Sequence, residues 1–139
     1  MSAPEQTTPQ SLLADFVGAL EGLQTSVQRT NIDGRSLQQQ FLTVQQLYQQ
    51  QLLPTLAVSP LATSLTPYQT EMNRAFRLLG MDVTFLQTAK NVMTMQKRQA
   101  QMRQRLKTVL EFSRGLQEQL RGHEPLTAQG EQSDASELE

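Results

Sequence analysis

One pattern constrains this chain more than any other: over residues 95–120, mostly apolar side chains recur at alternating intervals of four and three residues. Such a spacing keeps them on one face of an α-helix. The positions are Met95, Gln99, Met102, Leu106, Val109, Ser113, Leu116 and Leu120. Thr94 is suited to cap this helix, and Gly122 and Pro125 are suited to end it. We therefore expect a long helix over residues 95–122.

Residues 9–29 show the same helical periodicity. Thr8 can act as the N-cap, and Pro9 fits the first helical position because the N–H that it lacks would have no partner there. The apolar stripe consists of Leu13, Phe16, Leu20, Leu23 and Val27. A first helix is therefore predicted from Pro9 to about Arg29.

A second helix is predicted from Ser36 to the residue before Pro54. Ser36 and Gln39 have the spacing of a capping box, in which each side chain satisfies a free backbone N–H of the other residue. The apolar stripe is Leu37, Phe41, Val44 and Tyr48, widened by Leu47 and Leu52. Pro54 is expected to end the helix because it lacks a donor and clashes with the preceding turn.

A third helix is predicted over residues 67–90, after a crossover at 54–66 that lies on the bundle. Thr66 and Pro67 repeat the signal of a cap followed by a proline. Apolar side chains then recur every seven residues, with Phe76 and Val83 beside them. They are Met72, Leu79, Leu86 and Met93.

These segments predict an all-α fold, an antiparallel four-helix bundle with long third and fourth helices and a disordered acidic C-terminal tail. At 1.5 Å per residue the last two helices would be about 40 Å long and the first two about 30 Å. We expect a flexible N-terminus at residues 1–8, the bundle domain at 9–122 and the tail at 123–139. The tail carries five acids and no Lys or Arg, whereas residues 1–122 carry a net charge of +4.

The composition argues against an enzyme, a secreted protein and a membrane-spanning protein. There is no cysteine, no run of 18 apolar residues and no signal peptide, so we expect a cytoplasmic protein without a membrane span. The only histidine, His123, lies beside Gly122 where the tail begins. No nucleophile with a base, carboxylate–histidine cluster or glycine-rich phosphate loop is present, so we predict no catalytic residue, no cofactor and no metal.

Basic residues gather around the start of the fourth predicted helix with no acid within a helical turn of them. They are Lys90, Lys97, Arg98, Arg103 and Arg105. A partner protein's acidic surface could bind here. Alternatively, the arginines cap carbonyls of the preceding helix or cover the edge of the core with their stems. A nucleic-acid-associated regulator would use the same residues, but interleaved aromatic side chains and a strongly basic pI are missing.

Charged residues elsewhere have structural interpretations. Asp82 falls near the apolar stripe of the third helix, so it should form a structural ion pair with an arginine of the fourth helix such as Arg105. Further along, side chains of alternating sign could pair along the outer face of the fourth helix. They are Lys107, Glu111, Arg114, Glu118 and Arg121.

The first two helices carry a candidate helix interface. Gly18 and Gly22 fall on the outer face of the first helix, where a second helix could approach closely or where the helix is simply weak. The second helix has no charged residue between Ser36 and Leu53 and is rich in glutamine, including Gln39, Gln46 and Gln50. A second subunit could cover such a face with little charge to desolvate, which would give a homodimer or a homo-oligomeric scaffold, although helix propensity alone also explains it.

Three stretches resemble the cyanobacterial heterocyst frequency control protein PatD family. They are SLQQQFLTVQQLYQQQL at 36–52, YQTEMNRAFRLLGMDVTFLQTAK at 68–90 and RQAQMRQRL at 98–106. The resemblance implies a small helical protein that acts on the tubulin-like division protein FtsZ and modulates its assembly. In filamentous species it also implies an influence on heterocyst frequency.

Overall fold

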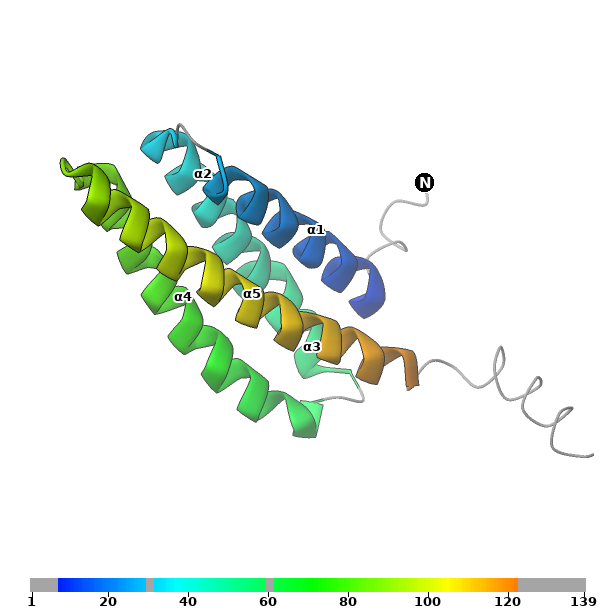
Figure 1. The fold of residues 1–139 in the computed structure, drawn as a ribbon. Coiled ribbons are helices and arrows are strands. Elements are labelled where there is room, and N and C mark those ends of the chain that lie inside the picture. The colour runs from blue at the N-terminus through cyan, green and yellow to red at the C-terminus, as the bar shows by residue number, and fades with distance from the viewer. Residues whose placement is uncertain (1–7, 30–31, 60–61, 123–139) are drawn as a thin grey trace, which may run out of the picture.

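The computed structural model describes residues 8–29, 32–59 and 62–122, which form the predicted all-α four-helix bundle (Figure 1). The described part contains no strand. Its four legs are α1 (Pro9–Val27), α2 (Gly34–Gln46) with its continuation, α4 (Leu65–Thr88) and α5 (Val92–Gly122). The continuation of α2 is a π-helical turn (Leu47–Leu52) followed by α3 (Leu53–Ala57), and a 3-10 turn (Ala62–Ser64) precedes α4.

Each leg packs against two neighbours in the antiparallel sense. α1 contacts α2 and, most extensively, α5, while α4 contacts α2 and α5. Gln87 near the end of α4 donates a hydrogen bond to the carbonyl of Gly34 at the start of α2. Gln99 near the start of α5 donates to the carbonyl of Arg29, just past the end of α1, at 3.0 Å. The four axes therefore run side by side, as Figure 1 shows.

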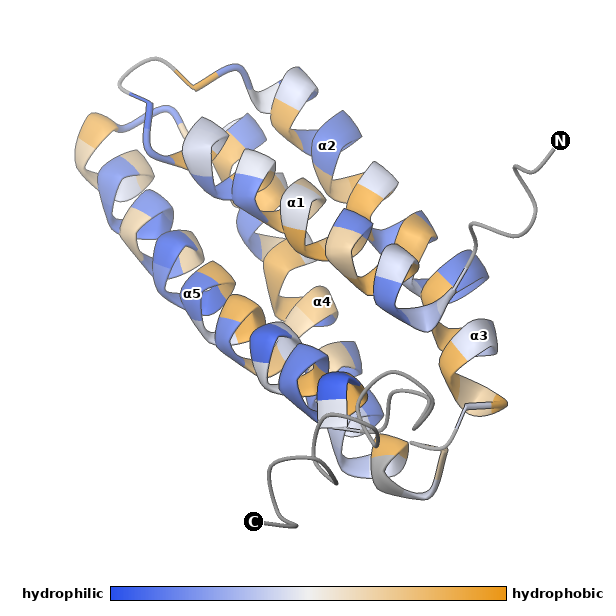
Figure 2. Cartoon of the chain, turned by 90° about the vertical axis from the view of Figure 1, so that its right-hand side faces the viewer, coloured by the Kyte–Doolittle hydropathy of each residue, from blue (hydrophilic) through white to orange (hydrophobic). Residues whose placement is uncertain are grey.

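Aromatic rings hold the centre of the bundle together. Phe76 of α4 lies 5.1 Å from the ring centroid of Tyr48 and 6.2 Å from those of Phe16 and Phe41. These rings come from three legs, and Figure 2 shows the hydrophobic residues of α4 on the side turned toward the other helices. Burial raises the pKa of the Tyr48 hydroxyl to about 12, so the ring stays neutral within this core.

The capping box predicted for the second helix is wrong. α2 begins at Gly34, and its N-cap is Asp33, whose Oδ1 accepts a hydrogen bond from the backbone N–H of Arg35 at 3.2 Å. Asp33 has an extended backbone and a side-chain acceptor ahead of Ser36, so it satisfies the first free donors before Ser36 can. Ser36 is an exposed residue of the first turn.

Pro54 does not end the second leg as predicted. The backbone N–H of Leu53 donates to the carbonyl of Tyr48, five residues earlier, and Pro54 is the second residue of α3. A π-turn of this kind interrupts the α-helical ladder, and a missing N–H costs little at the start of the next helix. The continued leg buries Leu52 and Leu56, which offsets the irregular turn.

Two more boundaries differ from the prediction. α4 begins at Leu65, so Thr66 and Pro67 lie within its first turn and Thr66 is not a cap that precedes the helix. α5 begins at Val92, two residues before the predicted cap Thr94.

The cap of α5 is Asn91. Its Oδ1 accepts hydrogen bonds from the backbone N–H groups of Met93 at 2.8 Å and Thr94 at 3.2 Å. The predicted N-cap Thr8 does accept from Ser11 N–H at 3.0 Å, and Gly122 is the last residue of α5, as predicted. The predictions for residues 1–7, for the tail at 123–139 and for His123 and Pro125 lie outside the described residues.

Candidate functional site

Exposed apolar side chains gather where α4 ends and α5 begins. Within the described residues, the large apolar side chains that stay exposed are Leu42, Val58, Met81, Phe85, Val92 and Met93. The last four of these six define what we call the hairpin tip. Met81 and Phe85 lie one turn apart on the same face of α4, and Met93 is 77% exposed. An exposed apolar cluster of this kind is typical of a protein-binding surface.

Met93 corrects the predicted third helix. Its seven-residue spacing from Leu86 placed it on the apolar stripe of that helix, but α4 ends at Thr88. Met93 instead belongs to the first turn of α5, beyond the end of the bundle core. The hairpin tip was therefore missed, because its exposure depends on where α4 stops.

Most of the hairpin tip, from Phe85 to Met93, lies in a basic stretch that contains no acid. Residues 83–110 include six Lys or Arg residues and no Asp or Glu. Lys90, Lys97 and Arg103 are exposed and form no ion pair within the described ranges. These three predicted partner-binding residues therefore keep an uncompensated positive charge, and Lys90 and Lys97 do so within four residues of Met93 along the chain.

Arg98 and Arg105 do not have the uncompensated charge that the sequence predicts. Arg105 Nε donates to Asp82 Oδ2 at 2.7 Å, which is the predicted structural pair. Arg98 NH1 lies 4.0 Å from Asp82 Oδ1, and its guanidinium carbon lies 3.8 Å from the ring centroid of Phe85. For Arg98 the prediction considered acids on the same helix only, whereas Asp82 reaches it from α4. Neither arginine caps the end of α4, which was one of the two alternative interpretations, the other being that the arginine stems cover the edge of the core.

Asp82 is fully buried and anchors this cluster. Burial raises the pKa of its carboxyl group, and the hydrogen bond from Arg105 and the charges of Arg105 and Arg98 only partly oppose that rise. Asp82 Oδ1 has no hydrogen bond, so the carboxylate is incompletely satisfied. Its bond to Nε holds the Arg105 side chain in one orientation, with the two terminal nitrogens left to bind elsewhere.

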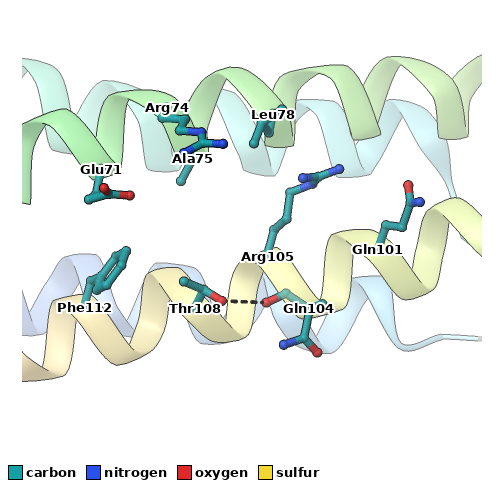
Figure 3. Close-up of a pocket in the computed structure, with 9 residues that line it drawn as sticks. All are labelled: Glu71, Arg74, Ala75, Leu78, Gln101, Gln104, Arg105, Thr108 and Phe112. Atoms are coloured by element: carbon teal, nitrogen blue, oxygen red, sulfur yellow. Dashed lines mark hydrogen bonds between the residues drawn. The ribbon is translucent and has the colours of Figure 1, made fainter.

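A groove of about 310 Å³ lies between α4 and α5 beside this ion pair (Figure 3). We call it the α4–α5 groove, and its apolar lining comes from Ala75, Leu78 and Phe112. Arg74 on α4 and Arg105 on α5 enter it from opposite walls, as Figure 3 shows. Sequence periodicity did not reveal this groove, because it forms only where the flanks of two helices meet.

The candidate interface on the first two helices is open. A Cβ added to Gly18 or Gly22 would meet nothing within 4 Å, so none of the described helices approaches them closely. Gly22 and Gln39 line a second groove of about 380 Å³ between α1 and α2, whose lining contains no charged side chain. Gln46 and Gln50 are exposed and do not line this groove.

The predicted row of ion pairs on α5 is only partly present. Arg121 pairs with Glu118 at 2.7 Å, but Arg114 pairs with Glu21 of α1 instead of a neighbour on its own helix. Lys107 and Glu111 form no ion pair within the described ranges. Both pairs are exposed, so each contributes little to stability.

Metal-binding geometry is not found in the described part of the chain. No group of three or more His, Cys, Asp or Glu side chains there could hold a metal ion. None of the described helices has the length and apolar character needed to cross a membrane.

Comparison with family models, with curated proteins and with solved structures gives no significant match.

Proposed function

We propose that this chain is a non-catalytic regulator that binds FtsZ and modulates its assembly, as its resemblance to the PatD family implies. In a filamentous host, the same activity would influence heterocyst frequency. The observation that carries the protein-binding part is the hairpin tip, an exposed apolar cluster with the unpaired cations Lys90 and Lys97 close to it in the chain. The partner's name comes from the resemblance alone.

The geometry suggests how binding would act without chemistry. Burying Met81, Phe85 and Met93 against a partner would remove apolar surface from water, and Lys90 and Lys97 would attract acidic residues at the rim. The closely packed core makes the four-helix bundle rigid, so it would keep its shape when it binds a partner. A bundle bound to the surface of one FtsZ subunit would favour or block the addition of the next subunit. The amount of polymer would change accordingly.

Sedimentation with polymerising FtsZ tests the proposal. The informative variant is Lys90→Glu combined with Lys97→Glu, which reverses two unpaired cations at the hairpin tip. Its matched control is Lys107→Glu with Arg121→Glu, two exposed residues farther along α5 whose reversal changes the net charge equally away from the tip. We expect wild type and control to co-pellet with FtsZ and the tip variant to bind about tenfold more weakly.

Two outcomes would contradict the proposal in different ways. If the wild type neither pellets with FtsZ nor changes the amount of polymer, FtsZ is the wrong partner. If the tip variant binds as well as the control variant, FtsZ binds at a different surface.

A nucleic-acid-associated regulator is the second candidate, favoured by the acid-free stretch at residues 83–110. A gel mobility shift at several salt concentrations separates the two functions. Binding to nucleic acid through phosphates would weaken steeply with salt. The slope of the logarithm of the binding constant against the logarithm of the salt concentration would be about −1 for each phosphate contacted. High-affinity binding with that slope in the wild type, and its loss in the tip variant, would favour nucleic acid over FtsZ as the partner.

A further inference from the structure

Two stripes of side chains along the contact between α4 and α5 join the α4–α5 groove to the hairpin tip. On α4 the stripe steps by three or four residues through Ala75, Leu78 and Asp82 to Phe85. On α5 it steps in the same way from Arg98 through Gln101 and Arg105 to Thr108 and Phe112. Arg98 connects the two features, because it stacks on Phe85 and also donates to Gln101 in the groove lining at 3.3 Å.

The length of this surface suits one helix. The α5 stripe from Arg98 to Phe112 covers 14 residue steps, or about 21 Å at 1.5 Å per residue. That length matches about four turns of a docked helix. A helix laid in the groove between two others would bury its apolar face against Leu78, Ala75 and Phe112, which the bundle itself leaves partly exposed.

The charges of the rim select the kind of helix. Arg74 is exposed and forms no ion pair within the described ranges, and the terminal nitrogens of Arg105 make no hydrogen bond there. Because Asp82 fixes Nε of Arg105, the guanidinium loses little further freedom when it binds a carboxylate. Glu71 is the one acid in the groove lining and lies at the end away from the hairpin tip.

We propose that the α4–α5 groove, extended to Phe85, is the docking site for an acidic amphipathic helix of a partner protein. This inference rests on the proposed function only in that the partner is a protein. The helix places apolar side chains on the groove floor and carboxylates against Arg74 and Arg105. A membrane surface fits less well, because the apolar floor lies between two helices where a flat surface cannot reach it.

The test exploits the absence of cysteine from the chain. Thr108→Cys places a single thiol in the α4–α5 groove, and Thr43→Cys places one in the groove between α1 and α2. The two sites are well matched, since each threonine hydroxyl donates to the carbonyl four residues earlier in its own helix. Protection of the thiol from reaction with a maleimide dye then reports which groove is occupied.

The probe is a synthetic helical peptide of about 15 residues with leucine along one face and glutamate elsewhere. A second peptide carries lysine in place of each glutamate. We expect the saturating acidic peptide to slow labelling of Thr108→Cys about tenfold and to leave Thr43→Cys unchanged. The lysine peptide should leave both thiols unprotected, because it places cations against Arg74 and Arg105.

Charge variants test the rim. In the Thr108→Cys background, Arg74→Glu should weaken binding of the acidic peptide about tenfold. Arg77→Glu, which changes the net charge equally from outside the groove lining, should leave the affinity unchanged. Arg74 and Arg77 are both exposed and unpaired within the described ranges, so neither change should unfold the bundle.

The proposal is overturned if the acidic peptide fails to protect Thr108→Cys, or if both peptides protect it equally. Protection by anionic phosphatidylglycerol vesicles as strong as that by the peptide would assign the groove to a membrane surface instead. Protection that rises with protein concentration alone would assign it to a second copy of this chain. If the peptide protects the groove but FtsZ does not pellet with the protein, the FtsZ proposal fails and the groove proposal stands.

Discussion

Arg105 of α5 donates a hydrogen bond from Nε to Oδ2 of Asp82 on α4, and the two members of this pair differ sharply in exposure. The Asp82 side chain is fully buried, whereas that of Arg105 is 30% exposed. Removing the arginine therefore leaves a buried carboxylate without its main partner. Removing the aspartate leaves a cation that can turn toward water.

Arg105→Gln should destabilise the bundle by about 2–3 kcal/mol, less than a fully buried pair would lose because Arg105 is partly hydrated. Arg98→Gln should cost less than about 1 kcal/mol, because its ion-pair distance to Asp82 is 4.0 Å and its stacking on Phe85 is exposed. Urea unfolding followed by circular dichroism measures both. Equal losses would mean that Asp82 depends on the two arginines alike.

Asp82 should make folding stability depend on pH in the sense opposite to that of an ordinary paired carboxylate. Because its pKa is raised in the folded state, the folded protein binds this proton more tightly than the unfolded chain does. The contribution of Asp82 to the free energy of unfolding is therefore most favourable below its ordinary pKa and decreases as the pH rises through the raised pKa.

Asp82→Asn removes this titration and makes it measurable. Between about pH 3 and about pH 7, the free energy of unfolding of the wild type should fall relative to that of the variant. Urea unfolding of both proteins across this range gives the difference at each pH. A difference that moves the other way would mean that the two arginines outweigh burial and lower the pKa.

Asn91→Ala should destabilise the bundle by about 1 kcal/mol, because Asn91 satisfies two backbone donors at the start of α5. Thr94→Ala should change the free energy of unfolding by only a few tenths of a kcal/mol, since an exposed residue of the first turn contributes little beyond propensity. Thermal unfolding of the two variants under one buffer condition decides between these caps. A larger loss for Thr94→Ala would restore Thr94 as the cap.

Gly22→Ala should stabilise the monomer by about 0.5–1 kcal/mol, because the added Cβ meets nothing and the helix gains propensity. Gly115→Ala is the contrasting variant on α5, where the new Cβ would lie 3.3 Å from the Tyr68 hydroxyl. Thermal unfolding compares the two. A loss of stability in Gly22→Ala, together with a smaller mass by light scattering, would show that a second subunit packs against Gly22.

Sequence periodicity predicts most of this fold because a four-helix bundle repeats one local rule. The spacing of Phe16, Phe41 and Phe76 places each on the buried side of its helix, and all three lie in the core. The Asp82–Arg105 pair could also be predicted, since an acid on an apolar stripe needs a cation from the next helix. These residues have only one low-energy place to go, so local and tertiary structure agree.

Other features depend on competition that the periodicity does not describe. Asp33 and Asn91 replace the predicted caps because the first suitable acceptor along the chain takes the free donors. Pro54 is accommodated because burying Leu52 and Leu56 stabilises the fold by more than the irregular π-turn destabilises it. The α4–α5 groove depends on the register of two helices, which Asp82, Arg105 and the neighbouring contacts set in three dimensions.

The extensive packing of α1 on α5 has a consequence for how the chain matures. Of the described elements α1 leaves the ribosome first, yet α5, which packs on it most extensively, is made last. Part of the apolar face of α1 therefore stays accessible to chaperones and to other nascent chains until translation has passed α5. A chain truncated within α5 would keep the hairpin tip but leave part of α1 uncovered. Cellular quality control would therefore recognise such a chain by its exposed first helix.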